Sequence, residues 1–181
     1  SIINHKEYKK IQKEFTEGLD FLVKEIKEKK ELVNDIQDKI FKMNLLSLSM
    51  YYSLNLIENS LESFEIIFSD YYFDDDIINN NIFNLTHTIL ELYGHYKNNM
   101  KVISQGINLI KVIVDNHSVE LKNESLYNVV LFLTSIILYI NINNTNNRVS
   151  EVQTKKISQI ILNRCIEKFI AQNNSNHNNN N

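Results

Sequence analysis

The chain contains no proline and only three glycines among its 181 residues, and this lack of turn-forming residues sets the strongest limit on its fold. Proline and glycine mark the turns of hairpins and the tight loops between strands. Phosphate-binding loops also require several glycines close together. The sequence therefore predicts an all-α fold, and the length is that of one domain with its own core.

Apolar residues recur at intervals of three and four along most of the chain, as they do on the buried faces of amphipathic helices. They predict about six helices, arranged as an irregular bundle or a short α-solenoid within a single domain of residues 1–171. The last four helices are expected at about 81–96, 100–116, 124–142 and 150–172. Residues 172–181 are Asn-rich and low in complexity, which predicts a disordered tail.

The first helix is expected to be long and amphipathic, running from about residue 5 to residue 43. Its apolar stripe follows a heptad-like pattern and consists of Phe15, Leu19, Leu22, Ile26, Val33, Ile36, Ile40 and Met43. Such a stripe suits either a coiled coil with a partner or packing against the rest of the domain, and we favour the second. The next segment, 45–73, is apolar on most faces, so it predicts a buried helix. Whether residues 5–68 form one helix or a hairpin stays open.

The most apolar segment, residues 126–142, raises the question of a membrane-spanning helix. It is shorter than the roughly 20 residues that a spanning helix needs, and Asn128, Thr134, Ser135 and Asn141 dilute it. No basic cluster flanks it closely, and residues 1–30 do not show the basic-then-apolar pattern of a targeting segment. We therefore expect a central helix that neighbours cover on most sides, and no transmembrane segment. The single cysteine, Cys165, favours a reducing compartment, so we expect a cytoplasmic protein.

Two groups of residues invite a metal site, and neither matches a known pattern closely. Residues 69–81 are expected to form a loop that includes Asp74, Asp75 and Asp76. The loop lacks the alternating ligands, central glycine and closing glutamate of a calcium-binding loop, so an acidic solvated loop is the better interpretation. His87, Glu91 and His95 share one helix face and could bind zinc, but a surface coincidence is the favoured interpretation.

The remaining chemistry of the sequence argues against an enzyme or a nucleic-acid partner. The net charge is −3, and no basic patch with interleaved aromatic residues is present. Cys165 falls on the apolar side of its helix, which favours a core residue over a reactive thiolate. We therefore expect no catalytic residues, no cofactor and no metal, while an active site around the histidine stripe remains a third hypothesis.

Two segments in the second half of the chain share one pattern. Residues 89–113 can be laid over residues 136–162 at an offset of 47 to 50, and both read as apolar helix, short polar turn and apolar helix. This pattern is similar to armadillo or HEAT repeats, and the resemblance implies a superhelical scaffold that binds other proteins. The abundance of Asn, Ile, Lys, Tyr and Phe resembles the codon bias of an A/T-rich genome.

We therefore expect a non-enzymatic protein–protein interaction domain of a larger scaffold or assembly. The partner is expected to be another protein, with self-association through the first helix as one form. A peripheral membrane or trafficking component that uses its apolar helices is the alternative. The candidate partner-binding residues come from the exposed face of the first helix and from the aromatic and acidic loop: Lys24, Lys27, Tyr71, Tyr72, Phe73, Asp74 and Asp75.

Overall fold

The computed structural model describes residues 6–7, 9–11, 13–14, 17–18, 21, 24, 30–49, 54–70, 74–96, 99–116, 119–143 and 149–179. Over these residues every regular element is a helix, so the all-α class is confirmed and the expected number of about six helices is close. The predicted long first helix is not shown, because residues 25–29 lie outside the described residues. The helices from residue 30 onward are α2 (Lys30–Leu48), α3 (Leu54–Asp70), α4 (Asp75–Tyr96), α5 (Met100–Asp115), α6 (Asn123–Asn143) and α7 (Val149–Asn178).

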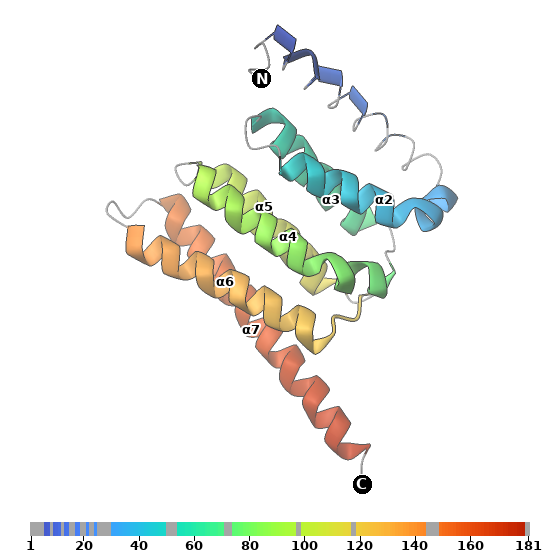
Figure 1. The fold of residues 1–181 in the computed structure, drawn as a ribbon. Coiled ribbons are helices and arrows are strands. Elements are labelled where there is room, and N and C mark those ends of the chain that lie inside the picture. The colour runs from blue at the N-terminus through green and yellow to red at the C-terminus, as the bar shows by residue number, and fades with distance from the viewer. Residues whose placement is uncertain are drawn as a thin grey trace.

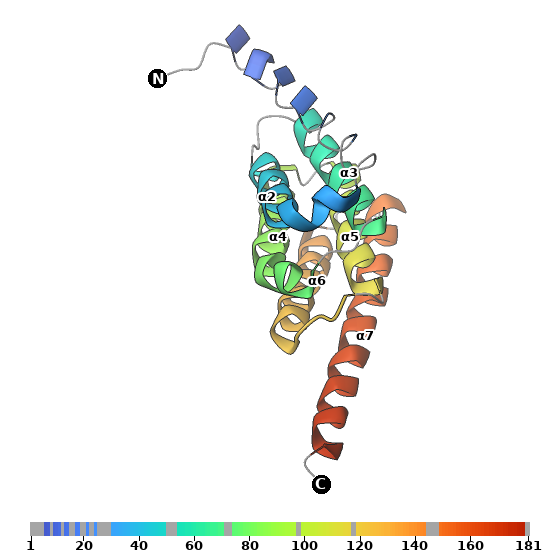
Figure 2. The same ribbon diagram turned by 90° about the vertical axis from the view of Figure 1, so that its right-hand side faces the viewer.

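These six helices form three hairpins that stack side by side in two layers (Figure 1). The helices α2, α4 and α6 lie in one layer, and α3, α5 and α7 lie in the other, as Figure 2 shows from the side. Each helix packs on its hairpin partner and on its neighbours within its layer. Each helix from α4 onward begins on the order of 45–50 residues after its equivalent in the preceding hairpin, which agrees with the internal offset that the sequence indicates.

The first described hairpin answers the question of one helix or two for residues 30–70. The helix α2 ends at Leu48, and the Ser49 amide donates to the carbonyls of Leu45 and Leu46, both at 3.1 Å. The Ser49 hydroxyl also donates to the Leu45 carbonyl at 2.9 Å, and such side-chain bonds compete with a continuing helix. The returning helix α3 packs against α2 through Phe41, whose ring meets Phe64 edge-on at 5.1 Å.

The expected loop at 69–81 is wrong at Ser69 and Asp70, which end α3, and from Asp75 onward, because α4 begins there. The Asp74 carboxylate accepts a hydrogen bond from the Asp76 amide at 2.8 Å, so Asp74 caps the helix. Asp75 and Asp76 lie in the first turn, where negative charge suits the helix dipole. The Asp74 amide donates to the Gln37 side chain of α2 at 2.9 Å, which fixes the start of α4 against the preceding hairpin.

The hairpin α4–α5 is closely packed around a glycine. Gly106 lies in the interior of α5, where a Cβ atom would lie only 2.6 Å from Cγ2 of Ile89 on α4. Glycine weakens a helix interior, so its presence here indicates that the two backbones need close approach. Ile89 and the residues around Gly106 belong to the one core that runs through the stack.

The helix α6 is less covered than the sequence predicts. Its inner side carries buried Leu126, Val129 and Leu133, whereas Leu138 and Ile142 are more than half exposed. By length and composition the helix from Asn123 to Ile142 could cross a membrane, and only 39% of its most apolar window is buried. The expectation of cover on most sides is therefore wrong, because α4 and α7 pack on one side of α6 and leave the other open.

The helix α7 continues beyond its expected end at residue 172, through Asn178, so the expected disorder is wrong for residues 173–178. Gln172 donates from Nε2 to the Leu121 carbonyl at 2.7 Å. Asn123 donates from Nδ2 to Oδ1 of Asn173 at 3.3 Å. These contacts hold the Asn-rich segment against the start of α6, although asparagine by itself is a poor helix former.

Candidate functional site

Polar side chains at the acidic start of α4 bind the connector between α5 and α6. Asn79 lies at the centre, and its Nδ2 donates to the carbonyls of Asp75 at 2.8 Å and Glu120 at 2.9 Å. Its Oδ1 accepts from the Lys122 amide at 2.9 Å and from the Ser125 hydroxyl at 2.6 Å. One amide side chain therefore satisfies backbone groups of the connector that would otherwise need water or another partner.

The acidic residues that the sequence offers as a partner site have structural contacts of this kind. Asp75 accepts from the Glu120 amide at 3.2 Å, and Lys122 pairs with Asp76 at 3.1 Å. Lys24 is helical and exposed. Tyr71, Tyr72, Phe73 and Lys27 lie outside the described residues. Partner binding by this set of residues stays a prediction. Asp74 and Asp75 also have a structural role, at the start of α4.

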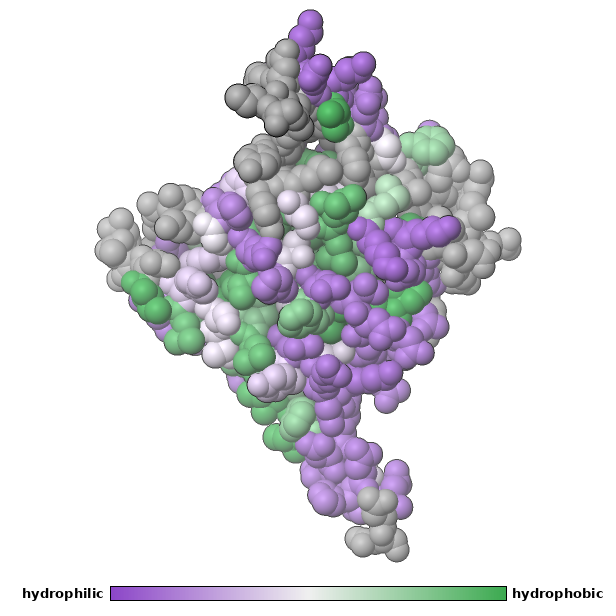
Figure 3. Space-filling model, viewed as in Figure 1, coloured by the Kyte–Doolittle hydropathy of each residue, from purple (hydrophilic) through white to green (hydrophobic). Residues whose placement is uncertain are grey.

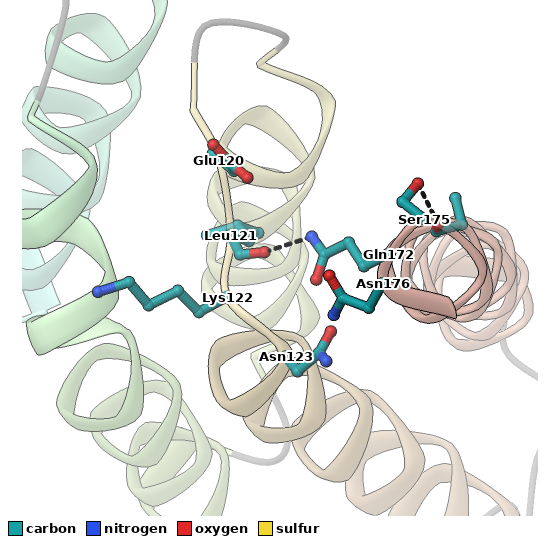
Figure 4. Close-up of a pocket in the computed structure, with 8 residues that line it drawn as sticks. Glu120, Leu121, Lys122, Asn123, Gln172, Ser175 and Asn176 are labelled. Atoms are coloured by element: carbon teal, nitrogen blue, oxygen red, sulfur yellow. Dashed lines mark hydrogen bonds between the residues drawn. The ribbon is translucent and has the colours of Figure 1, made fainter. Parts of the chain in front are cut away.

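A polar hollow of about 440 Å³ lies between this connector and the C-terminal part of α7 (Figure 4). It is open to solvent, and its lining consists of Glu120, Leu121, Lys122, Asn123, Ala171, Gln172, Ser175 and Asn176. Figure 4 shows Lys122 pointing away from α7, toward the side where its ammonium pairs with Asp76. Glu120 is then the one ionisable side chain left at the hollow among these lining residues. A nucleophile with an adjacent base, the arrangement that covalent catalysis needs, is not found among them.

An apolar groove lies between α4 and α6, on the layer that Figure 1 shows in front. We call it the α4–α6 groove, and it is lined by Phe83, Thr86, His87, Leu90, Asn128, Leu131, Phe132 and Ser135. Its hollow part has a volume of about 100 Å³. The hydroxyls of Thr86 and Ser135 donate to carbonyls of their own helices, at 3.0 and 2.8 Å. The groove therefore presents mainly apolar atoms to solvent.

The apolar surface extends beyond the groove along α6. Phe83 is 56% exposed and Leu131 is 48% exposed, and Tyr127 and Leu138 continue the row on the same side of α6. No charged residue occurs from Ser125 through Asn143. Figure 3 shows apolar side chains in a green band along the lower left edge of the molecule, over α6, whereas the right-hand part of this face is mainly hydrophilic.

The histidine stripe is only partly assembled. His87 Nε2 lies 3.0 Å from Glu91 Oε1, and its ring stacks on Phe83 with a centroid distance of 5.9 Å. Across the part of the chain that the structure describes, no three His, Cys, Asp or Glu side chains lie together as a metal site requires. His95 therefore does not complete a three-ligand site with the other two.

Cys165 is a core residue, as the sequence predicts. It is fully buried, and burial raises the pKa of its thiol to about 11. Two nearby charges have smaller effects on this pKa: the Lys168 ammonium lowers it and the Asp115 carboxylate raises it. The thiol is therefore protonated at neutral pH, and a reactive thiolate needs the opposite shift.

Comparisons with protein-family models, with curated proteins and with solved structures found no match for this chain. Function must therefore be inferred from the geometry of the surfaces described above.

The sequence by itself does not identify several of the residues that shape these surfaces. Asn79 resembles any other residue of an Asn-rich run, and only its position opposite the connector gives it four hydrogen bonds. Tyr127, Leu131 and Leu138 do carry a signal, because they recur at intervals of four and seven on a helix that is apolar on both sides. That pattern does not say which side is exposed.

Proposed function

We propose that this chain is a helical protein–protein interaction domain of a larger scaffold or assembly, and that its α4–α6 groove binds an apolar helix of another protein. The observation that carries this proposal is the exposed, uncharged apolar row formed by Phe83, Tyr127, Leu131 and Leu138. Contiguous apolar surface on a folded domain commonly marks an interaction site. A groove between neighbouring helices is a common receptor for the apolar face of a helix.

The size and chemistry of the groove support a helical peptide over a small ligand. Sites for drug-sized molecules have volumes of roughly 300–1,000 Å³, whereas the hollow part of this groove has about 100 Å³. An apolar cavity of about 150 Å³ holds a single benzene ring. The hollow therefore suits one anchoring side chain, and the exposed row on α6 suits the next turns of the same partner helix. Resemblance to armadillo or HEAT repeats, and the stacking of hairpins, support a scaffold role.

The experiment compares two single substitutions of exposed apolar residues. In Leu131→Asp the charge enters the groove, whereas in Leu46→Asp it enters the exposed side of α2, outside the groove. Proteins captured from native lysate by the wild-type chain are quantified by mass spectrometry against both variants. We expect a set of proteins that Leu131→Asp loses at least about tenfold and Leu46→Asp retains, because about 1.4 kcal/mol of lost binding energy is a tenfold change. Equal capture by all three chains would refute the proposal.

A peripheral membrane or trafficking component is the second candidate, and the incomplete burial of α6 is the observation that favours it. Leu138 and Ile142 would then contact lipid through the open side of that helix. Flotation with neutral phosphatidylcholine vesicles tests this candidate directly. Binding that is lost in Leu138→Asp supports lipid contact, whereas wild-type chain that stays with the unbound fraction excludes it.

A further inference from the structure

The side of α7 that faces away from the stack carries a regular pattern of its own. The helix packs on α5 and α6, and residues on its remaining side are exposed. Six of them recur at intervals of four and three, and we call them the α7 outer stripe: Val152, Lys156, Gln159, Asn163, Ile166 and Ile170. The apolar members are well exposed, with Val152 at 51%, Ile166 at 44% and Ile170 at 52%. These intervals are those of the contact positions in a coiled coil.

The stripe can pair with an antiparallel copy of itself. It begins and ends with an apolar residue and has Gln159 and Asn163 at its centre, with Lys156 on one side of the centre and Ile166 on the other. An antiparallel copy therefore places Val152 opposite Ile170 of the other chain. It also places Gln159 opposite Asn163, whose amides can donate to and accept from each other.

We propose that two copies of this chain associate through the α7 outer stripe, with the two α7 helices antiparallel and related by a two-fold axis that passes between Gln159 and Asn163. Lys156 then crosses Ile166 of the second copy, and its ammonium reaches Glu167, which is exposed beside the stripe. The two-fold axis generates this contact twice. The paired helices overlap over about 27 Å, the length of the stripe at 1.5 Å per residue.

Charge selects the antiparallel direction and the identity of the partner. A parallel copy would place Lys156 beside Lys156 and Glu167 beside Glu167, and like charges at such positions are destabilising. The antiparallel copy replaces both repulsions with opposite-charge contacts. The polar centre specifies the register at some cost in stability, as single polar residues do in coiled coils. We therefore expect a dimer of moderate affinity with one defined register.

Sedimentation velocity over a range of chain concentrations tests the proposal with two charge reversals. Lys156→Glu alone and Glu167→Lys alone each place like charges opposite one another, so each should weaken dimerisation by about tenfold or more. An equimolar mixture of the two variants restores both opposite-charge contacts. We therefore expect the mixture to form a heterodimer more tightly than either variant forms a homodimer.

Separate controls test whether each variant folds and whether the effect is specific to α7. All the substituted side chains are exposed, and circular dichroism checks that each variant keeps its helix content. Leu46→Asp changes an exposed apolar residue on α2 and should leave dimerisation unchanged. A wild-type chain that is monomeric at every concentration overturns the proposal. A dimer that neither charge reversal weakens, or a mixture that associates no better than its components, overturns it as well.

Discussion

Substitution of Gly106 with alanine measures how closely α4 and α5 pack. Alanine should stabilise an exposed helix position by about 1 kcal/mol relative to glycine. At Gly106, however, the added methyl would lie 2.6 Å from Cγ2 of Ile89. That atom is a branched methyl on a buried helical side chain with a restricted χ1 angle, so it cannot swing aside. Overpacking of this kind costs typically about 1–3 kcal/mol. We therefore expect a net destabilisation of roughly 0–2 kcal/mol.

Gly94 provides a matched control within the same hairpin. It lies in α4 and is exposed, and a methyl group added there would have no neighbouring atom within 4 Å. Gly94→Ala should therefore stabilise the chain by about 0.5–1 kcal/mol. The free energy of unfolding of both variants is measured by urea denaturation followed by circular dichroism.

A double-mutant cycle assigns the effect to the contact itself. Ile89→Ala removes the obstructing methyl and should cost about 2–5 kcal/mol by itself. In that background Gly106→Ala should become stabilising, because its methyl now fills vacated space. The two substitutions should therefore couple by about 2 kcal/mol, within the usual range for residues in contact. The reasoning is refuted if Gly106→Ala stabilises the wild-type chain as Gly94→Ala does, or if the coupling is near zero.

Three further predictions test the connector, the core thiol and the end of α7. Asn79→Ala should lower the unfolding free energy by about 1–2 kcal/mol because it removes hydrogen bonds to the connector that water only partly replaces. The exposed neighbour Asn80→Ala should be nearly neutral, and urea denaturation measures both. The Cys165 thiol should resist a thiol reagent at pH 8 until the chain unfolds. The folded pKa of this thiol, about 11, lies above the ordinary 9.0, so the stability that the buried neutral thiol contributes is fully present below pH 9 and is lost as the pH rises through 11. Relative to Cys165→Ala, the free energy of unfolding of the wild-type chain should fall by about 3 kcal/mol over this range. Gln172→Ala should cost about 1 kcal/mol and expose the end of α7 to faster hydrogen exchange, whereas the exposed Asn174→Ala should not.

Local signals in the sequence were sufficient for the fold class and for most boundaries in the second half of the chain. The helices α5 and α6 begin and end within one residue of their expected limits. Such boundaries are local: the Asn99 side chain accepts from the Val102 amide at 3.4 Å, three residues along, and caps α5. The start of α4 was missed because Asp and Asn can either interrupt a helix or begin one. Here they begin a helix, and the Asp74 amide at its start donates to the side chain of Gln37, which lies 37 residues earlier.

The candidate surfaces depend on the tertiary structure. Sequence alone indicated that the chain is helical, that two segments of its second half are similar at an offset of 47 to 50 residues, and that Cys165 belongs to the core. Only the stacking of the hairpins decided that Leu131 faces solvent while Leu133, two residues later, is buried. Hydrogen bonding and helical periodicity act over a few residues, so the sequence carries them directly. Whether an apolar side is covered depends on helices that lie some 45–50 residues away in the chain, and periodicity does not record their positions.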